Sequence, residues 1–204
     1  MHAAGAERPM GPASAERPMR ADAQRNYAKL LSAASAAFVE SGADDVSLEG
    51  IARRAGVGIG TLYRHFPTRQ ALLEAVYQDQ AEQLAARADE LLRSDSPAEA
   101  FAAWLHALLA FSSTKRSLTA AMVATLGKDS ELMSTCSKLI KDSADALLAR
   151  AQQAGAVRAD VNSTDVIRLM HGVSMVTEYA PGDPGQADRM LALILDGLRP
   201  QTAG

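Results

Sequence analysis

The residues best suited to a chemical role lie in one segment, 48–66, which reads LEGIARRAGVGIGTLYRHF. Positions 51–70 contain no Asp or Glu, but they include four arginines and one histidine: Arg53, Arg54, Arg64, Arg69 and His65. The whole chain has a net charge of −3, so this basic segment contrasts with a mildly acidic remainder. A local basic patch on an acidic body is typical of a protein that contacts phosphates at one end only.

The same segment has the pattern of two short helices joined by a tight turn. Helices that cross steeply need a small residue at their contact, which Ala52 supplies, and the turn needs a residue that tolerates positive φ, which Gly56 supplies. We expect the space between the helices to be filled by apolar side chains: Ile51, Ala55, Val57 and Leu62. The side chains that remain outside on the second helix are Gly60, Thr61, Arg64 and His65, with Tyr63 at the edge. Such a face can form hydrogen bonds in the major groove of DNA.

From about Asp22 to Tyr77 the chain resembles the tetracycline-repressor (TetR) family of transcriptional regulators. The resemblance rests on VSL at 46–48, IARRAGV at 51–57, TLYRHF at 61–66 and TRQALL at 68–73, and it covers about a quarter of the chain. It implies a helix-turn-helix that binds double-stranded operator DNA, and a helical body that binds a small-molecule effector and forms a homodimer. Beyond this segment the chain matches the family only in the number and order of its helices.

Carried over position by position, the resemblance assigns roles to several residues of the helix-turn-helix. Thr61 is expected to contact a base or a phosphate, and the Tyr63 hydroxyl to donate to a phosphate oxygen. His65 and Arg69 would hold phosphates, Arg69 from the start of the following helix, where the helix dipole assists. Arg64 occupies a position that varies in the family, so it is the candidate for reading guanine.

Three further residues complete the predicted DNA-binding set: Ser47, Gly58 and Gly60. Ser47 is the expected N-cap of the first helix of the pair. Gly58 stands where many relatives have a serine N-cap, so the recognition helix should lack a side-chain cap. Gly60 leaves a bare patch on the DNA-facing side, which specifies no base.

The elements that position these residues are predicted to be helices alone. Apolar residues make up 48% of the 204 residues and aromatics only 4%, which favours packed helices over a sheet sandwich. We predict a disordered tail at 1–20, a helix-turn-helix domain at 21–67 and a helical effector-binding and dimerisation domain at 68–204. Apolar periodicity and capping residues predict helices at about 22–42, 47–55, 58–65, 68–93, 96–111, 115–126, 129–154, 163–179 and 186–198.

The region 96–180 contains an unusual set of aromatic, methionine and histidine side chains. Met and aromatic residues can line an adaptable ligand cavity, in which one or two polar groups fix the ligand's orientation. Alternatively, they form a helical core with satisfied histidines. On the first interpretation, a mostly apolar effector would contact Trp104, His106, Leu108, Phe111, Met122, Met170, His171 and Met175.

The last predicted helix is apolar around most of its circumference, which a one-sided surface helix does not need. Burial between two subunits would explain this, and the resemblance also implies a dimer built from the last two long helices. The predicted interface residues are Val176, Tyr179, Met190, Leu191, Ile194, Leu195 and Leu198.

Other function classes lack support in the sequence. We find no nucleophile elbow, phosphate loop, nucleotide-binding glycine pattern or zinc-ligand spacing, so we expect no catalysis, cofactor or metal. No apolar run approaches the roughly 20 residues that cross a bilayer, and the N-terminus lacks the apolar stretch of a secretory signal, so we expect a cytoplasmic protein. Two alternatives stay open: a helical adaptor without DNA binding, and a DNA-binding regulator without a small-molecule effector.

Overall fold

The structure, a computed structural model, describes residues 13–126, 130–179, 183 and 185–200. These residues form eight α-helices and no strand, which confirms the all-α prediction. Their bounds are α1 Ala13–Asp45, α2 Leu48–Ala55, α3 Ile59–His65, α4 Arg69–Leu91, α5 Pro97–Leu126, α6 Glu131–Gln153, α7 Ser163–Tyr179 and α8 Gln186–Gly197. No helix in the described part of the chain is long and apolar enough to span a membrane.

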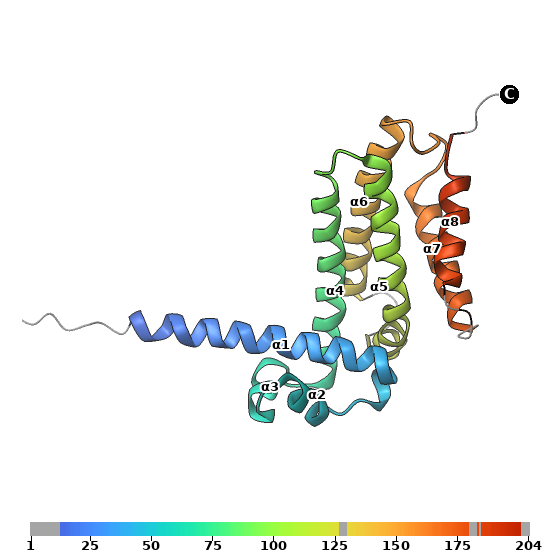
Figure 1. Cartoon of the computed structure of the whole chain (residues 1–204). Helices are drawn as coiled ribbons and strands as arrows, with labels where there is room; N and C mark the ends of the chain where they lie inside the picture. Colours follow the sequence, from blue (N-terminus) through green and yellow to red (C-terminus); the bar gives the residue numbers. More distant parts are fainter. Residues whose placement is uncertain (1–12, 127–129, 180–182, 184, 201–204) are drawn as a thin grey trace, which may run out of the picture.

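The helices form two groups that meet at α1 (Figure 1). α2 and α3 lie on one side of α1, and α4, α5 and α6 rise from its other side. α7 and α8 pack side by side at the edge of the body that lies away from α4. The recognition helix α3 therefore lies at one end of the molecule, and the α7–α8 pair lies along its side.

The start of α1 differs from the prediction. The helix begins at Ala13, so residues 13–20 are helical rather than disordered, and the remaining predicted tail residues, 1–12, lie outside the described part. Ala, Glu, Arg and Met in this stretch are good helix formers, whereas Pro18 opposes a helix, so local propensity alone does not explain the earlier start. At the other end, Gly42 has φ 78° and ψ 162°, so the regular helical backbone is interrupted at the glycine that the sequence predicted as its end.

α5 is one helix of 30 residues, whereas the sequence predicted two helices at 96–111 and 115–126. Polar residues at 112–115 lie where the two predicted helices would meet. They include neither proline nor glycine, the two residues that oppose helix continuation most strongly, so the backbone has no local reason to leave the helix there.

Caps and turns fix the short helices of the helix-turn-helix. The Ser47 hydroxyl accepts a hydrogen bond from the Gly50 N–H at 3.0 Å, and the Thr68 hydroxyl accepts one from the Ala71 N–H at 3.0 Å. Gly56 ends α2 in the left-handed conformation, with φ 65°. Gly58 begins α3 without a side-chain cap, as predicted.

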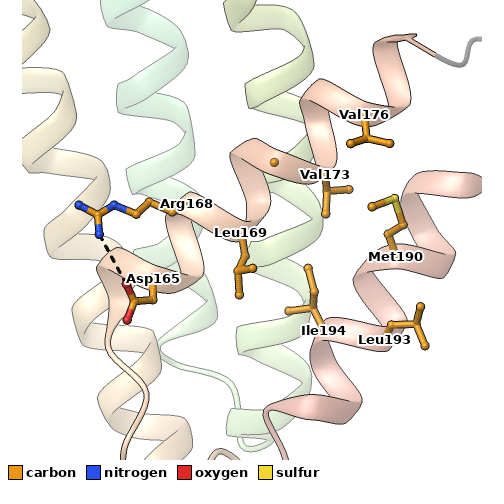
Figure 2. Close-up of a pocket in the computed structure, with 9 residues that line it drawn as sticks. Asp165, Arg168, Leu169, Val173, Val176, Met190, Leu193 and Ile194 are labelled. Atoms are coloured by element: carbon orange, nitrogen blue, oxygen red, sulfur yellow. Dashed lines mark ion pairs between the residues drawn. The ribbon is translucent and has the colours of Figure 1, made fainter.

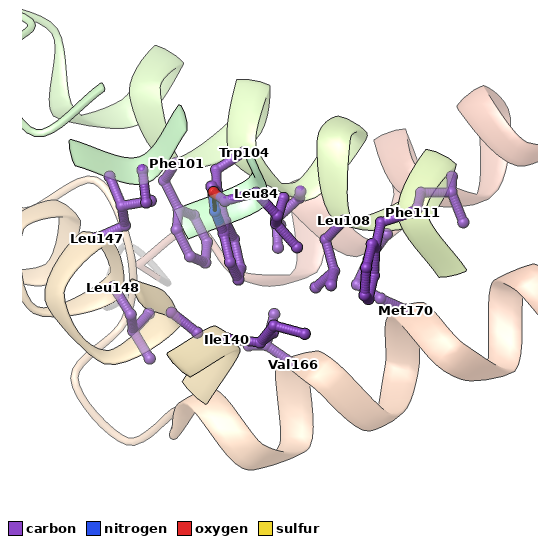
Figure 3. Close-up of a cluster of buried hydrophobic side chains, with 14 of the residues drawn as sticks. Leu84, Phe101, Trp104, Leu108, Phe111, Ile140, Leu147, Leu148, Val166 and Met170 are labelled. Atoms are coloured by element: carbon purple, nitrogen blue, oxygen red, sulfur yellow. Dashed lines mark hydrogen bonds between the residues drawn. The ribbon is translucent and has the colours of Figure 1, made fainter. Parts of the chain in front are cut away.

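Two hydrophobic clusters hold the fold together. The first lies in the helical body and centres on α4, α5 and α6, with contributions from α7 and α8 (Figure 3). The second joins the helix-turn-helix to the body: Ile51 of α2 and Leu62 of α3 pack with α1, with the first turns of α4, and with Leu118 and Met122 of α5. The predicted domain boundary at 67/68 falls between α3 and α4, but the hydrophobic cluster continues across it.

Replacing Gly56 tests how strongly the turn between α2 and α3 depends on a glycine. A Cβ at Gly56 would meet no atom within 4 Å, so the cost of Gly56→Ala arises from the left-handed backbone alone. We expect a loss of about 1–2 kcal/mol in the free energy of unfolding. Gly60→Ala is the matched control: Gly60 lies inside α3 with equally open space, and alanine should stabilise the helix by up to about 1 kcal/mol. Equal effects of both substitutions in urea denaturation would contradict this account.

Candidate nucleic-acid interface

The two sides of α3 have different roles. Leu62 is buried, and so is Phe66 at the end of the helix, which anchors α3 to the second hydrophobic cluster. On the outer side Arg64 is exposed, Tyr63 is 44% exposed, and Thr61 is half-buried. Gly58 and Gly60 are also exposed. The helix therefore presents a hydroxyl, a phenol and a guanidinium to solvent, the groups that can contact DNA bases and phosphates.

An aromatic cluster ties the end of α3 to α1. The ring centroid of Tyr27 in α1 lies 5.7 Å from that of His65 in an edge-on arrangement, and 5.1 Å from that of Phe66. His65 is half-buried as a result. Its position depends on α1 as well as on its own helix, which restricts how it can face a phosphate.

Arg69 makes a contact that the sequence did not suggest. Its half-buried guanidinium donates a hydrogen bond to the Val46 carbonyl, 2.5 Å away. Residue 69 begins α4 and residue 46 precedes α2, so this bond links the two ends of the helix-turn-helix. Arg69 thus has a structural contact in addition to its predicted role toward phosphate.

Arg54 forms a two-pronged ion pair with Glu40, with N–O distances of 2.5 and 2.6 Å. The hydrogen bond from Arg54, together with its positive charge, lowers the pKa of Glu40, and the same contact raises the pKa of Arg54. The pair joins α2 to α1 across 14 residues of sequence, a separation with no local pattern to reveal it. Arg53, by contrast, is exposed and forms no ion pair within the described part, so it is a further candidate for a phosphate contact.

The predicted effector residues lie in three different places: the core of the body, the hydrophobic cluster beside the helix-turn-helix, and the surface. Trp104, Leu108, Phe111 and Met170 come together, but in the packed core of the body (Figure 3). Trp104 is 0% exposed, and its indole N–H donates to the Leu84 carbonyl at 3.3 Å. Met122 belongs to the other cluster, beside the helix-turn-helix.

The other three predicted effector residues lie at the surface: His106, His171 and Met175. His106 lies 3.7 Å from Asp188 of α8, measured from Nδ1 to Oδ1. Met175 is 50% exposed. Among the described residues, no three His, Cys, Asp or Glu side chains are grouped so that they could hold a metal ion.

An apolar groove of about 720 Å³, open to solvent, lies between α7 and α8 (Figure 2). Three of the predicted interface residues line it: Val176, Met190 and Ile194. Leu169, Val173 and Leu193 line it as well, although the sequence did not single them out for the interface. Leu193 is 73% exposed, and the Asp165–Arg168 pair, 3.6 Å apart, lies at one end.

The remaining predicted interface residues lie elsewhere. Leu191 is 0% exposed and Leu198 7%, and both pack into the core of their own subunit, so they are not available to a partner. Leu195 is half-buried against the same core. Tyr179 ends α7, and its side chain lies outside what the structure describes. An apolar helix near a chain end can bury one face inside its own subunit, and composition alone cannot separate that face from an intersubunit one.

Comparison with known proteins identifies the class that this arrangement defines. The family model for the C-terminal domain of SbtR-like transcriptional regulators matches residues 96–200. The model for bacterial regulatory proteins of the tetR family matches residues 30–76.

Solved structures of TetR-family regulators are similar to this chain over most of its length. A TetR transcriptional regulator from Streptomyces coelicolor is 38% identical, with a TM-score of 0.75, over 85% of this chain and 98% of that one. A TetR transcription regulatory protein from Mycobacterium vanbaalenii is 34% identical, with a TM-score of 0.74, over 90% of this chain and all of that one (100%).

An HTH-type transcriptional regulator from Staphylococcus aureus is 40% identical over 60 residues, 29% of this chain and 32% of that protein, so that match spans about a third of the relative's length.

The chain therefore belongs to the TetR family of DNA-binding transcriptional regulators. Its class is that of a regulator, not an enzyme.

Two substitutions on α3 should separate positioning contacts from base reading. Tyr63→Phe removes a hydroxyl that we expect on a phosphate, so affinity should fall alike for all DNA sequences. Arg64→Ala should instead relax the preference at one base position, by about 1–3 kcal/mol if the contact is bidentate. Fluorescence anisotropy on a selected operator and on single-base variants of it would measure both effects. Uniform losses on every duplex for both variants would contradict this division of roles.

Proposed function

We propose that this protein is a homodimeric regulator that binds an inverted-repeat operator, with one α3 helix in each of two successive major grooves. The observation that carries the proposal is the two-sided geometry of α3. Leu62 and Phe66 hold it against α1 and α4, while Thr61, Tyr63 and Arg64 face outward. A fixed helix with an exposed polar and basic side is what major-groove recognition requires. Action on bacterial DNA would place the protein in the cytoplasm.

The dimer would form through the α7–α8 groove. Half of the large apolar side chains that the described surface exposes lie on these two helices: Leu169, Met175, Val176 and Leu193. A contiguous exposed apolar surface marks a site of interaction, since monomeric proteins rarely leave one open to water. A two-fold contact between identical α7–α8 faces would bury all four side chains and close the groove.

We further propose that the regulator is a repressor released from its operator by a small molecule. The support is its membership of a family in which this mode of control is typical. By thermodynamic linkage, such an effector must bind the free dimer more tightly than the DNA-bound dimer.

One observation favours a second candidate, a regulator without an effector in the core of the body. The side chains expected to surround a ligand there pack against one another: Trp104 and Met170 are both 0% exposed. Control by a protein partner, or constitutive binding, would need no cavity at this position.

Charging the α7–α8 face should break the dimer and operator binding together. Leu193→Glu would place an unpaired carboxylate in the buried interface, so we expect a monomer that no longer binds the operator. Leu193 suits this test better than Leu195, because its side chain is 73% exposed and its replacement leaves the subunit core intact. Light scattering and a gel shift on the same samples would measure both outcomes.

The matched control adds the same charge elsewhere. Ala86 is an exposed residue of α4, and α4 lies on the opposite side of the body from α8, so Ala86→Glu should leave both dimer and binding unchanged. A Leu193→Glu protein that remains dimeric would remove this face from the interface.

A further inference from the structure

A second hollow lies between α1 and α4, well away from the α7–α8 groove. It has a volume of about 460 Å³, and its lining includes Tyr27, Leu31 and Ser35 from α1 and Asp79, Gln80 and Gln83 from α4. Ser35, Gln80 and Gln83 also line a neighbouring hollow of about 330 Å³, which extends to Leu84 and Phe111 and includes Arg87, whose guanidinium is paired with Glu90 at 2.8 Å. We call the two together the α1–α4 cleft.

The carboxylate of Asp79 gives the cleft its charge. Asp79 accepts a hydrogen bond from the Gln83 amide at 2.7 Å, and no cation in the described part forms an ion pair with it. Burial, followed by the nearby charge of Glu82, raises the pKa of Asp79. Burial raises the pKa of Tyr27 too, and so do the negative charges of Asp79 and Glu82. This end of the cleft therefore has a negative potential without a positive partner.

Gln80 adds an unused acceptor. Its amide N–H donates to the Ser35 hydroxyl at 2.8 Å, while its Oε1 is buried and has no hydrogen-bond partner within the described part. Buried acceptors in native proteins are almost always satisfied, so an unpaired one in a cleft suggests a missing donor.

We propose that the α1–α4 cleft binds a small organic cation with N–H donors and an apolar body, such as an amidine or a primary amine. The positive group would pair with Asp79 against the ring of Tyr27, since a cation is attracted to a carboxylate and to an aromatic face alike. An N–H would satisfy Gln80, and the apolar body would lie toward Leu31 and, further along, Leu84 and Phe111. An anionic ligand would be repelled at the same position.

One residue of the cleft, Tyr27, directly contacts the end of the recognition helix. Tyr27 lines the cleft and also contacts His65 and Phe66 at the end of α3, with ring centroids 5.7 and 5.1 Å away. A ligand that moves Tyr27 or separates α1 from α4 would shift the support of the recognition helix. The binding step itself does not depend on the proposed DNA-binding function.

The test compares two probes of nearly equal shape, benzamidine, which is a cation, and benzamide, which is neutral. Both are titrated into the full-length, DNA-free protein while NMR follows the backbone amides of Ser35 and Gln80. We expect benzamidine to shift these signals with a dissociation constant of about 1 mM or below, and benzamide to bind at least about tenfold more weakly. Because DNA is absent, failure here is distinguishable from failure of the operator model.

Asp79→Asn removes the charge and keeps the shape, so it should weaken benzamidine binding by about tenfold and leave benzamide unaffected. Asp89→Asn is the control, because it removes the same charge from an exposed position further along α4 and should bind as the wild type does. Circular dichroism would verify that both variants fold. Equal affinities for the two probes, no shift at Ser35 or Gln80, or full binding by Asp79→Asn would overturn the proposal.

Discussion

The position of the recognition helix depends on one hydrophobic cluster that is shared between the helix-turn-helix and the body. Ile51 and Leu62, which hold α2 and α3 together, pack in the same cluster as Leu72 of α4 and Leu118 of α5, and all four are 0% exposed. Close packing of this kind transmits displacement, because side chains in a dense core cannot move independently. A change in α4 or in the end of α5 must therefore reach α3, and the helix-turn-helix cannot be regarded as a separately hinged unit.

Three polar or aromatic contacts further restrict the orientation of the helices that this hydrophobic cluster holds together. The Arg54–Glu40 pair joins α2 to α1, the Arg69 guanidinium joins the start of α4 to the Val46 carbonyl, and Tyr27 joins α1 to the end of α3. Each links two elements that border the DNA-facing side. An exposed ion pair such as Arg54–Glu40 adds little stability, so its main effect is on the orientation of α2 relative to α1. Tyr27 also lines the α1–α4 cleft, so a ligand bound there would act on the contact between α1 and α3.

The helix-turn-helix could be predicted from sequence because its requirements are local: a serine cap, a small contact residue, a turn glycine with positive φ, and apolar residues at helical spacing. The remaining features depend on long-range packing. Arg54 finds Glu40 across 14 residues, and Met122 joins the helix-turn-helix cluster because α5 continues to Leu126. Trp104 and Leu191 show the same limit, since apolar residues in a subunit core, a ligand pocket and an intersubunit face have the same composition, and only the assembled helices separate them.

In the proposed dimer, the paired α7–α8 faces fix the distance and the two-fold symmetry between the two α3 helices. Selection of bound sequences from random DNA tests this arrangement most directly, because the recovered motif reports both the symmetry and the spacing of the bound helices. We expect an inverted repeat whose half-sites are centred about 10 base pairs apart, or a multiple of that distance. Recovery of a single half-site, or of a direct repeat, would contradict it.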